Sequence, residues 1–466
     1  MHELTISLDT HNGCPMYEQI YEYIRNEIQN GRIEAGEKLP STRELSHFLG
    51  ISRSTVDLAY AQLVAEGYVE AFPCRGYYAC EMDPTYKVFP GKGAYRETSG
   101  HKEKQWFCDF ALNGIHQEGF PYQVWRKISK NILSEDDGSL FVLGDPQGES
   151  GLREELAKYL HYARGVNCKK EQILVGAGND YLLLLLHVIL GDGWKIAMDN
   201  PTYMSAYKAF TSMGYQVCGL EPDEMGMQPE KLEESGVDLA YVMPSHQFPL
   251  GSVMPIKRRQ ELLKWAGKKE TRFLIEDDYD SEFRYKGKPI PSLQGFDTKD
   301  NIIYLGTFSK SLAPAIRISY MVLPEILMDA YRQKAMNFSV TVSRVDQKIL
   351  EIFLRDGYFQ RHLNRMRGVY RGKHDCLLME MKKLHNICTV KGEQAGVHIL
   401  VEMKNGLSEE EAVERAAKVG IKVYGLSEFA ILPLQKRKNP TVLMGYATLS
   451  EEKIIKGIQM LEKVWR

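Results

Sequence analysis

A single lysine, Lys310, stands between two serines in the stretch GTFSKSLAPAIRISY, which spans residues 306–320. A lysine amine can attack an aldehyde to form a Schiff base, so Lys310 is a candidate covalent catalyst. Two other stretches carry groups that such chemistry needs. FLIEDDYDSEF ends an apolar run in several acids, and VGAGNDYLLLLL places a glycine turn before a long apolar run. A lysine, a carboxylate and a helix N-terminus are together what pyridoxal phosphate (PLP) requires of a protein.

Each demand of PLP has a candidate at the end of a separate apolar run. The carboxylate of Asp277 would face the pyridine nitrogen and hold it protonated. Tyr279 would contact the phenolic oxygen, and Tyr203 would stack on the ring. The turn that would cradle the phosphate through backbone N–H groups consists of Ala177, Gly178 and Asn179. Further candidates for the phosphate site or the remaining wall are Thr307, Ser309, Arg317, Ser245, His246 and Gln247.

Each of these signals also has a common structural explanation when it is taken alone. Acids at a strand end often form a solvated turn, and a tyrosine after Asn-Pro often serves packing. A glycine turn before a helix is frequent in many folds. The combination of all these groups in one chain is what favours a PLP site.

The candidates require elements that bring their side chains together. From Trp106 onward, apolar runs such as KIAMDNP, LAYVMP and RFLIEDD alternate with helical stretches, which predicts an α/β domain with a mainly parallel central sheet. Ligands of such sheets bind at the carboxyl ends of the strands, where the candidates stand. From about residue 375 to residue 466 the pattern changes to that of a smaller C-terminal α+β subdomain.

Residues 13–80 predict a helix-turn-helix followed by a hairpin. Ser41 and Glu44 form a capping box before one helix, and Gly50 makes the turn. The next helix would bury one apolar face, made of Val56, Ala59, Tyr60 and Leu63. YVEAFPCRGYYAC would form the hairpin, or wing. A small protein-interaction module is the alternative interpretation of this region. Residues 81–105 are rich in Pro, Gly and charge, which predicts a linker.

The charge of the N-terminal region bears on how it would bind DNA. Residues 1–80 hold six Lys or Arg and eleven Asp or Glu, so binding through phosphate neutralisation alone should be weak. Specific contacts by a few well-placed side chains fit better. The predicted DNA-binding residues are Lys38, Arg43, Arg53, Ser54, Thr55, Arg75 and Gly76.

The composition of the chain is typical of a globular protein and argues against several other classes. The 466 residues carry a net charge of -2 and are 44% hydrophobic, as expected of a globular protein. The eight cysteines form no CxxC pair, which argues against zinc and against a disulfide framework. The N-terminus does not resemble a signal peptide, and the apolar stretch 182–190 is too short to span a bilayer. We therefore expect a cytoplasmic protein without a metal site.

Both regions resemble known families. YEQIYEYI, LPSTRELSHFLGISRSTVDLAYAQLVAEGYV and the wing resemble the GntR-type winged helix-turn-helix. FPYQVWRK, GDPQGESGLREELAKYLHYARGV, PSHQFPLG, EDDYDSEFRY and GTFSKSLAPAIRISY are similar to fold type I PLP enzymes of the aspartate aminotransferase class. The whole chain resembles the MocR/GabR subfamily of transcriptional regulators, which join these two parts.

This resemblance implies a PLP-dependent regulator of transcription, with PLP held as an internal aldimine on Lys310. It also implies binding to a specific operator in double-stranded DNA, and an effector that is PLP, an amine or an amino acid. The family forms a head-to-tail, domain-swapped homodimer. An aminotransferase with an ancillary DNA-binding head is the alternative function, and a scaffold without cofactor is a third.

Two stretches depart from the family pattern. Aminotransferases and the GABA-responsive members of the family usually carry an arginine for the substrate carboxylate. At that place the stretch VLMGYA has Leu443, and leucine cannot bind a carboxylate. The basic stretch QKRKNP, residues 435–440, is a possible substitute. The G-x-P-D motif of the family is altered to GIHQEG at residues 114–119. PLP itself, or an amine without a carboxylate, thereby becomes the favoured effector.

Overall fold

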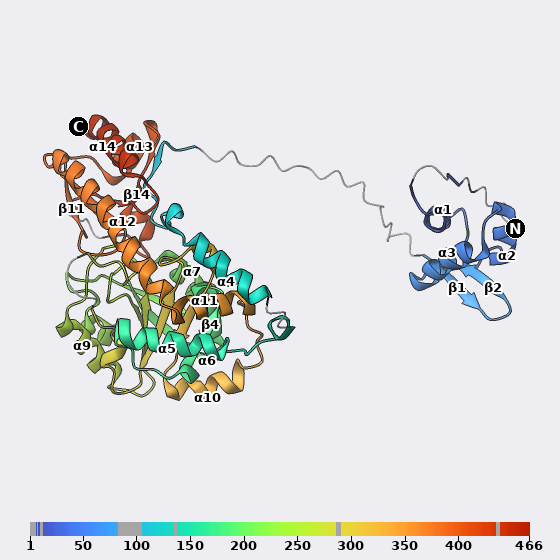
Figure 1. The fold of residues 1–466 in the computed structure, drawn as a ribbon, viewed down its shortest axis with the longest axis horizontal. Helices are drawn as coiled ribbons and strands as arrows, with labels where there is room; N and C mark the ends of the chain where they lie inside the picture. Colours follow the sequence, from blue (N-terminus) through green and yellow to red (C-terminus); the bar gives the residue numbers. More distant parts are fainter. Residues whose placement is uncertain are drawn as a thin grey trace. The chain divides into compact units, whose positions relative to one another are not determined.

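The computed structural model describes residues 6, 8–9, 13–82, 105–134, 138–285, 290–434 and 439–466. The chain divides into two compact units, Met1–Glu103 and Lys104–Arg466, and Figure 1 labels the elements of each. Most of the predicted linker lies outside the described residues, as do residues 435–438 of the basic stretch. Among the described residues, no helix is long and apolar enough to cross a membrane.

The first unit contains the predicted helix-turn-helix and wing. Its elements are α1 (Met16–Gln29), α2 (Thr42–Leu49), α3 (Arg53–Ala65) and the antiparallel strands β1 (Val69–Phe72) and β2 (Gly76–Ala79). The capping box is confirmed, because the Glu44 N–H donates to Ser41 Oγ at 3.2 Å and the Ser41 N–H donates to Glu44 Oε2 at 2.8 Å. Gly50 ends α2 in the left-handed conformation that glycine favours, with φ of 65°.

The core of this unit follows the predicted helical periodicity with one exception. Val56, Ala59, Tyr60 and Leu63 of α3 are fully buried, as predicted. Phe48, an apolar residue of α2, is instead 65% exposed. The buried face of this two-turn helix is formed by Thr42, Leu45 and Ser46, which leaves Phe48 outside it.

The second unit is built on a seven-stranded sheet with the order β4-β10-β9-β8-β7-β5-β6. Only β10 runs antiparallel to its neighbours, so the predicted mainly parallel sheet is confirmed. The strands are β4 (Ile173–Gly176), β5 (Lys195–Asp199), β6 (Gln216–Leu220), β7 (Leu239–Val242), β8 (Phe273–Asp278), β9 (Ile302–Thr307) and β10 (Ser319–Val322).

Helices cover both faces of this sheet, because alternate strand residues point to opposite sides and both sides are apolar. One face packs in a cluster with α6 (Asn179–Leu190), α7 (Met204–Ser212) and α10 (Glu325–Lys334). The other face packs in two clusters, one of them with α4 (Tyr122–Ser134), α5 (Ser150–Arg164) and α11 (Arg344–Arg355). The second of these clusters includes α8 (Pro229–Ser235) and α9 (Ile256–Ala266).

A smaller subdomain forms around the antiparallel sheet β11-β12-β15-β14. Its strands are β11 (Cys388–Lys391), β12 (His398–Met403), β14 (Tyr424–Gly425) and β15 (Thr441–Gly445), and its helices are α12 (Tyr358–Met381), α13 (Glu409–Lys418) and α14 (Glu451–Trp465). Strand β3 (Cys108–Asp109) pairs with β13 (Ile421–Lys422). Cys108 and Phe110 lie in the same apolar cluster as Met366 and Tyr370 of α12, upstream of residue 375. This core therefore combines the start of the unit with its end.

Candidate cofactor pocket and DNA-binding surface

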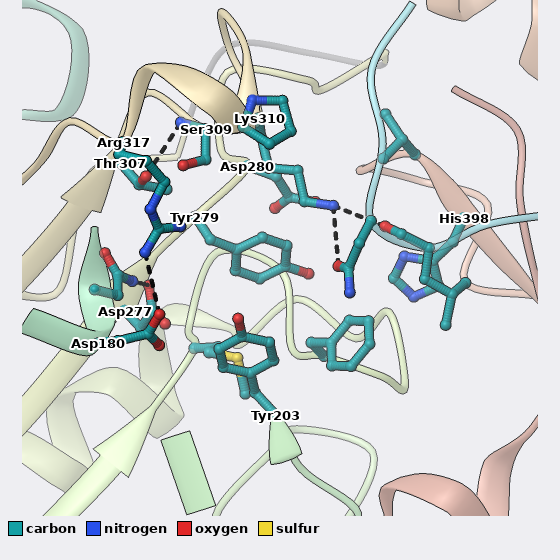
Figure 2. A pocket seen from close by; sticks show the side chains of 17 residues that line it. Asp180, Tyr203, Asp277, Tyr279, Asp280, Thr307, Ser309, Lys310, Arg317 and His398 are labelled. Atoms are coloured by element: carbon teal, nitrogen blue, oxygen red, sulfur yellow. Dashed lines mark hydrogen bonds and ion pairs between the residues drawn. The ribbon is translucent and has the colours of Figure 1, made fainter. Parts of the chain in front are cut away.

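A pocket of about 200 Å³ opens at the carboxyl ends of the central strands, and Figure 2 shows its lining. Eight of the residues predicted to hold PLP lie around it: Asn179, Tyr203, Asp277, Tyr279, Thr307, Ser309, Lys310 and Arg317. Their side chains come from the ends of β8 and β9, the start of α6 and the loops beyond. The sheet thus brings together residues that are far apart in the sequence, as its topology predicts.

Lys310 lies in the turn after β9, and its side chain is partly buried. The Lys310 amine donates to the carbonyl oxygen of Leu112 at 2.7 Å and approaches Asn113 Oδ1 at 3.4 Å. Burial lowers the pKa of Lys310 to about 8, while the nearby Asp280 carboxylate acts in the opposite direction. A substantial fraction of this amine is therefore neutral, and nucleophilic, near neutral pH.

Asp277 ends β8 and is buried. Its carboxylate accepts hydrogen bonds from the hydroxyl of Tyr241 and from Asn179 Nδ2, the latter at 3.4 Å. Burial raises the pKa of Asp277 to about 7, although the Tyr241 hydrogen bond favours the charged form. Among the described residues, no cationic side chain forms an ion pair with this carboxylate. The protonated pyridine nitrogen of PLP would supply a cationic partner for this carboxylate, so Asp277 fits PLP.

The predicted phosphate end of the pocket gathers around the start of α6, where Figure 2 shows Arg317, Asp180 and Thr307 together. Gly178 caps α6 with φ of 92° and ψ of 167°, a conformation open essentially to glycine alone. A side chain on Gly178 would also overlap with the guanidinium of Arg317. Arg317 Nη2 is held by Asp180 Oδ2 at 3.1 Å and by the Ala177 carbonyl oxygen at 3.3 Å.

The backbone N–H groups of this turn have other partners in the structure than the sequence predicts. The Ala177 N–H donates to Thr341 Oγ1 at 3.0 Å, and the Gly178 N–H donates to the Gly176 carbonyl oxygen at 2.8 Å. Neither group therefore points into the pocket as predicted. A helix leaves its first N–H groups without intrahelical partners, so those of Asn179 and Asp180 are the candidate donors at this end of the pocket.

The stretch predicted to form the remaining wall lies behind the pocket instead. Ser245 Oγ accepts from Arg164 Nη2 at 2.7 Å, and this arginine is also bound to Asp278 at 2.7 Å. His246 Nδ1 lies 2.8 Å from Asp280 Oδ2 and 2.9 Å from the Tyr279 hydroxyl. Neither side chain lines the pocket. His246 contacts the pocket residues Tyr279 and Asp280, whereas Ser245 holds Arg164 beside Asp278.

Gln247 shares this supporting role, because its side-chain amide donates to Asp199 Oδ2 at 3.2 Å and to the Pro201 carbonyl oxygen at 3.1 Å. These contacts join the 242–251 loop to the loop that carries Tyr203. The Tyr203 ring lies edge-on to Phe248, with centroids 6.0 Å apart, and lines the pocket. Its position fits the predicted cover of the cofactor ring.

Several pocket residues were not among the sequence candidates. They are Leu112, Asn113, Asp180, Met243, Phe248, Asp280, Pro314, Val397 and His398. Asp280 follows Asp277 and Tyr279 in the stretch EDDYDSEF, and its place in that acidic stretch was the available signal. Leu112 and Asn113 carry no such signal, because only the tertiary fold brings their segment to Lys310.

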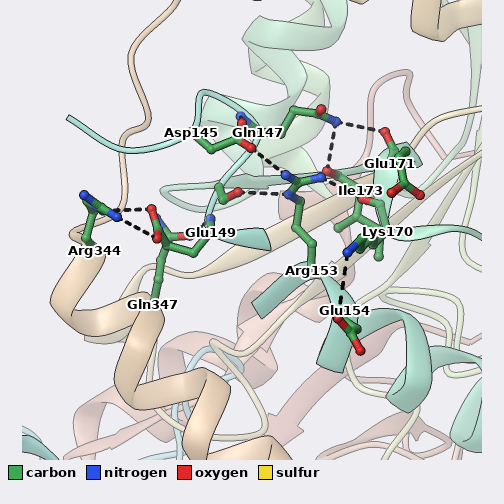
Figure 3. A network of polar contacts seen from close by, with 11 residues as sticks. Asp145, Gln147, Glu149, Arg153, Glu154, Lys170, Glu171, Ile173, Arg344 and Gln347 are labelled. Atoms are coloured by element: carbon green, nitrogen blue, oxygen red, sulfur yellow. Dashed lines mark hydrogen bonds and ion pairs between the residues drawn. The ribbon is translucent and has the colours of Figure 1, made fainter. Parts of the chain in front are cut away.

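The motif GDPQGESGLREEL supports β4, which leads to the start of α6. Figure 3 shows Arg153 at the centre of this network, where it binds Asp145 Oδ2 at 2.6 Å, the Gly148 carbonyl oxygen at 2.9 Å and the Lys170 carbonyl oxygen at 3.0 Å. Arg344 of α11 forms two hydrogen bonds with the carboxylate of Glu149, at 2.8 and 3.0 Å. These contacts fix the loop before β4, so the motif positions the pocket without entering it.

The predicted DNA-binding residues gather on α2, α3 and the wing of the first unit. Lys38, Arg43, Arg53, Ser54 and Arg75 are exposed, and Thr55 and Gly76 are partly exposed. Arg53 Nε lies 3.3 Å from Thr42 Oγ1 and 3.6 Å from Asp57 Oδ2, which holds its side chain along α3. The turn between β1 and β2 carries Arg75, and a side chain on Gly76 would touch that of Lys38.

Comparisons with known proteins match both units. The family model "Bacterial regulatory proteins, gntR family" matches residues 16–78, and "Aminotransferase class I and II" matches residues 110–454. The "Uncharacterized HTH-type transcriptional regulator YhdI" of Bacillus subtilis is 41% identical, over 99% of this chain and 98% of its own. The "Probable rhizopine catabolism regulatory protein MocR" of Rhizobium meliloti is 30% identical, over 98% of this chain and 95% of its own.

Among solved structures, the kynurenine aminotransferase of Pyrococcus horikoshii, crystallised in complex with PMP, is similar to the second unit. Its TM-score is 0.69 at 26% identity, and the match covers 78% of this chain and 91% of that one. The aminotransferase fold, the helix-turn-helix and the two full-length relatives agree with one another. The chain belongs to the MocR/GabR family of transcriptional regulators, which join a GntR-type winged helix-turn-helix to an aminotransferase class I and II domain.

Proposed function

We propose that this protein is a PLP-dependent transcriptional regulator that binds a specific DNA operator and senses an amine effector at the pocket around Lys310. The observation that carries the proposal is the pairing of two groups in one pocket. Asp277 is a buried carboxylate without an ion-pair partner among the described residues, and Lys310 is an amine with a lowered pKa. The same chain carries an exposed set of arginines on a helix-turn-helix.

When bound, PLP supplies an aldehyde that bonds to amines and a ring that withdraws electrons. Lys310 supplies the amine for that aldehyde and is the candidate catalytic residue. Asp277 would hold a proton at the ring nitrogen, and the hydroxyl of Tyr241 donates to this carboxylate and keeps it in place. Tyr203 would cover the ring, and the Tyr279 hydroxyl would bind the phenolic oxygen. These residues would bind and orient the cofactor.

The phosphate would bind at the start of α6. The N–H groups of Asn179 and Asp180 would donate to it, and Arg317, which also lines the pocket, would add a positive charge. The hydroxyls of Thr307 and Ser309 would complete it, and the hydrogen bond from the Ser309 N–H to Thr307 Oγ1, at 3.1 Å, keeps these two residues together. An anion at this place gains both hydrogen bonds and the favourable end of the helix dipole.

Regulation would follow from different affinities of the effector for two states of the protein. We propose that the head contacts DNA through α3 and the wing. Arg53 of α3 and Arg75 of the wing would form charge-assisted hydrogen bonds with the DNA. A homodimer, as the family resemblance implies, would present two heads to two half-sites of an operator.

An absorption spectrum of the purified protein tests the cofactor part of this proposal. With PLP added and the excess removed, we expect a visible band that borohydride bleaches. The band should be absent from Lys310→Ala and retained in Lys348→Ala, since Lys348 pairs with Glu351 on α11 instead of lining the pocket. A protein that shows no band after PLP is added would refute the proposal.

A PLP-dependent aminotransferase with an ancillary head is the second candidate function. It is favoured by the set of Lys310, Asp277 and Tyr279 in one pocket, because these residues would also serve a proton transfer. Release of keto product over many turnovers from an amine donor would support this function. Binding of the same amines without product, together with altered operator affinity, would support the regulator.

A further inference from the structure

The pocket has two chemically different ends. Figure 2 shows Arg317, Asp180 and Thr307 at one end and His398 at the other, with Lys310 between them. The end with Arg317 is the phosphate end. An effector that reaches Lys310 would therefore extend toward His398, and the residues there decide its chemical class.

The wall near His398 is apolar. Leu112, Phe248 and Val397 line it, and the rings of Phe248 and His398 lie 5.5 Å apart. Behind this wall, Leu443 of β15 is fully buried in the same apolar cluster as Leu112 and Phe248. A ligand carboxylate placed here would lose its water without gaining a charged partner, which is unfavourable.

The cations that line the pocket are already engaged. Among its described lining residues these are Arg317, which is held by Asp180, and Lys310, which donates to the Leu112 carbonyl oxygen. His398 stays neutral, because burial together with the nearby His246 lowers its pKa to about 3. Its Nε2 is 3.1 Å from the Pro249 carbonyl oxygen, so it donates there.

Carboxylates outnumber cations around the cavity. Asp180, Asp277 and Asp280 all line it, and Asp280 is buried beside His246. Asp180 pairs with Arg317 at the phosphate end, and Asp277 would pair with the ring nitrogen, so Asp280 is the carboxylate that opposes an anionic effector beside Lys310. The apolar wall and the charge of the pocket therefore both favour an effector without a carboxylate.

We propose that the effector is an aliphatic primary amine without a carboxylate, and that Leu443 determines this specificity. This inference rests on the proposed function, because the amine reaches the cofactor that Lys310 holds. The aliphatic tail packs against Leu112, Phe248 and Val397, and its burial provides the binding free energy. An amino acid of the same length binds more weakly, since its carboxylate meets no available arginine among the described residues that line the pocket.

The test compares three amines on the full-length, PLP-loaded protein at one pH, after free PLP is removed. Butylamine, norvaline and γ-aminobutyrate are titrated, and binding is followed by the change in the visible band and by calorimetry. We expect butylamine to bind at least about tenfold more tightly than either amino acid, as a lost charged contact requires. Equal or tighter binding of an amino acid overturns the inference, and so does the absence of any response to butylamine.

Two variants at one position examine the role of Leu443. Leu443→Arg should increase the affinity for norvaline or γ-aminobutyrate by about tenfold or more, because an arginine can bind a carboxylate bidentately. Leu443→Met conserves volume and adds no charge, so it should keep the preference for butylamine. If Leu443→Arg does not fold, the titrations of the unmodified protein still decide the ligand class.

The outcomes separate this inference from the function on which it rests. No visible band with PLP refutes the proposed function itself. A normal band with a preference for carboxylates leaves the PLP-dependent regulator intact and refutes only the ligand class. Loss of the butylamine preference in Leu443→Met overturns the assignment of specificity to the apolar side chain.

Discussion

The lowered pKa of Lys310 makes a quantitative prediction about how fast the protein captures PLP. A lysine reacts with an aldehyde only as the neutral amine, so the rate rises with pH up to the pKa and then levels off. Burial places this pKa at about 8, compared with 10.5 for an unperturbed lysine. The two values differ by about 2.5, so the neutral fraction at pH 7 is about 300-fold larger for Lys310.

The assay is the rate of growth of the visible band after PLP is mixed with the cofactor-free protein. Each rate is divided by that of Nα-acetyl-lysine in the same buffer, which cancels the ionisation of PLP. Below pH 8 both amines gain about tenfold in rate per pH unit, so the ratio is constant. Above pH 8 only the free lysine continues to gain, and the ratio falls. A ratio that stays flat to pH 10 would show that Lys310 has an ordinary pKa.

A charge variant tests the physical cause. The Asp280 carboxylate favours the protonated amine, so Asp280→Asn should move the bend in the ratio to lower pH. Asp329→Asn is the matched control, because Asp329 is exposed on α10 and pairs with Arg332. If both variants shift the bend equally, the effect of Asp280 is one of net charge and not of proximity.

Three further predictions concern the start of α6 and the head. Gly178→Ala should weaken PLP binding and destabilise the protein by about 1–3 kcal/mol. Gly191→Ala, at the other end of α6 with φ of 81° and ψ of -174°, should destabilise the protein without affecting its PLP affinity. Thermal unfolding measures the loss of stability and PLP titration the affinity. Arg53→Ala should reduce operator affinity by about 1–3 kcal/mol in a gel-shift assay, and Arg32→Ala, which removes an exposed pair with Glu27, should leave it unchanged. Ser41→Ala removes the capping box of α2 and should lower the free energy of unfolding of the first unit by about 0.5–2 kcal/mol, as measured by denaturant unfolding.

Local features were predictable from the sequence because the residues that create them are close together in it. The capping box of Ser41 and Glu44 spans one helical turn, and the buried face of α3 follows from its periodicity. The carboxyl ends of the strands were predictable for a similar reason, since each apolar run ends in the polar residues that face the pocket. Asp277 and Lys310 were found in this way.

Features that depend on distant segments were not predictable. The Ala177 N–H donates to Thr341, 164 positions away in the sequence, so it is not available to the pocket as predicted. Lys310 binds the Leu112 carbonyl oxygen across 198 positions. A backbone carbonyl has no sequence signature, because every residue carries one. Such contacts arise from the packing of the subdomains and not from residue type.

The arrangement of the two subdomains indicates how ligand binding in the pocket would affect other parts of the second unit. The lining includes Thr307 and Lys310 from the large sheet and His398 from the small subdomain, so a ligand there contacts both parts. Strand β3 pairs with β13, and its residue Cys108 packs in the core of the small subdomain. Any movement of the small subdomain would therefore carry β3, the first strand of the second unit. Since Leu112 follows β3 by a few residues and accepts a hydrogen bond from Lys310, a change at the lysine acts directly on the segment that follows β3.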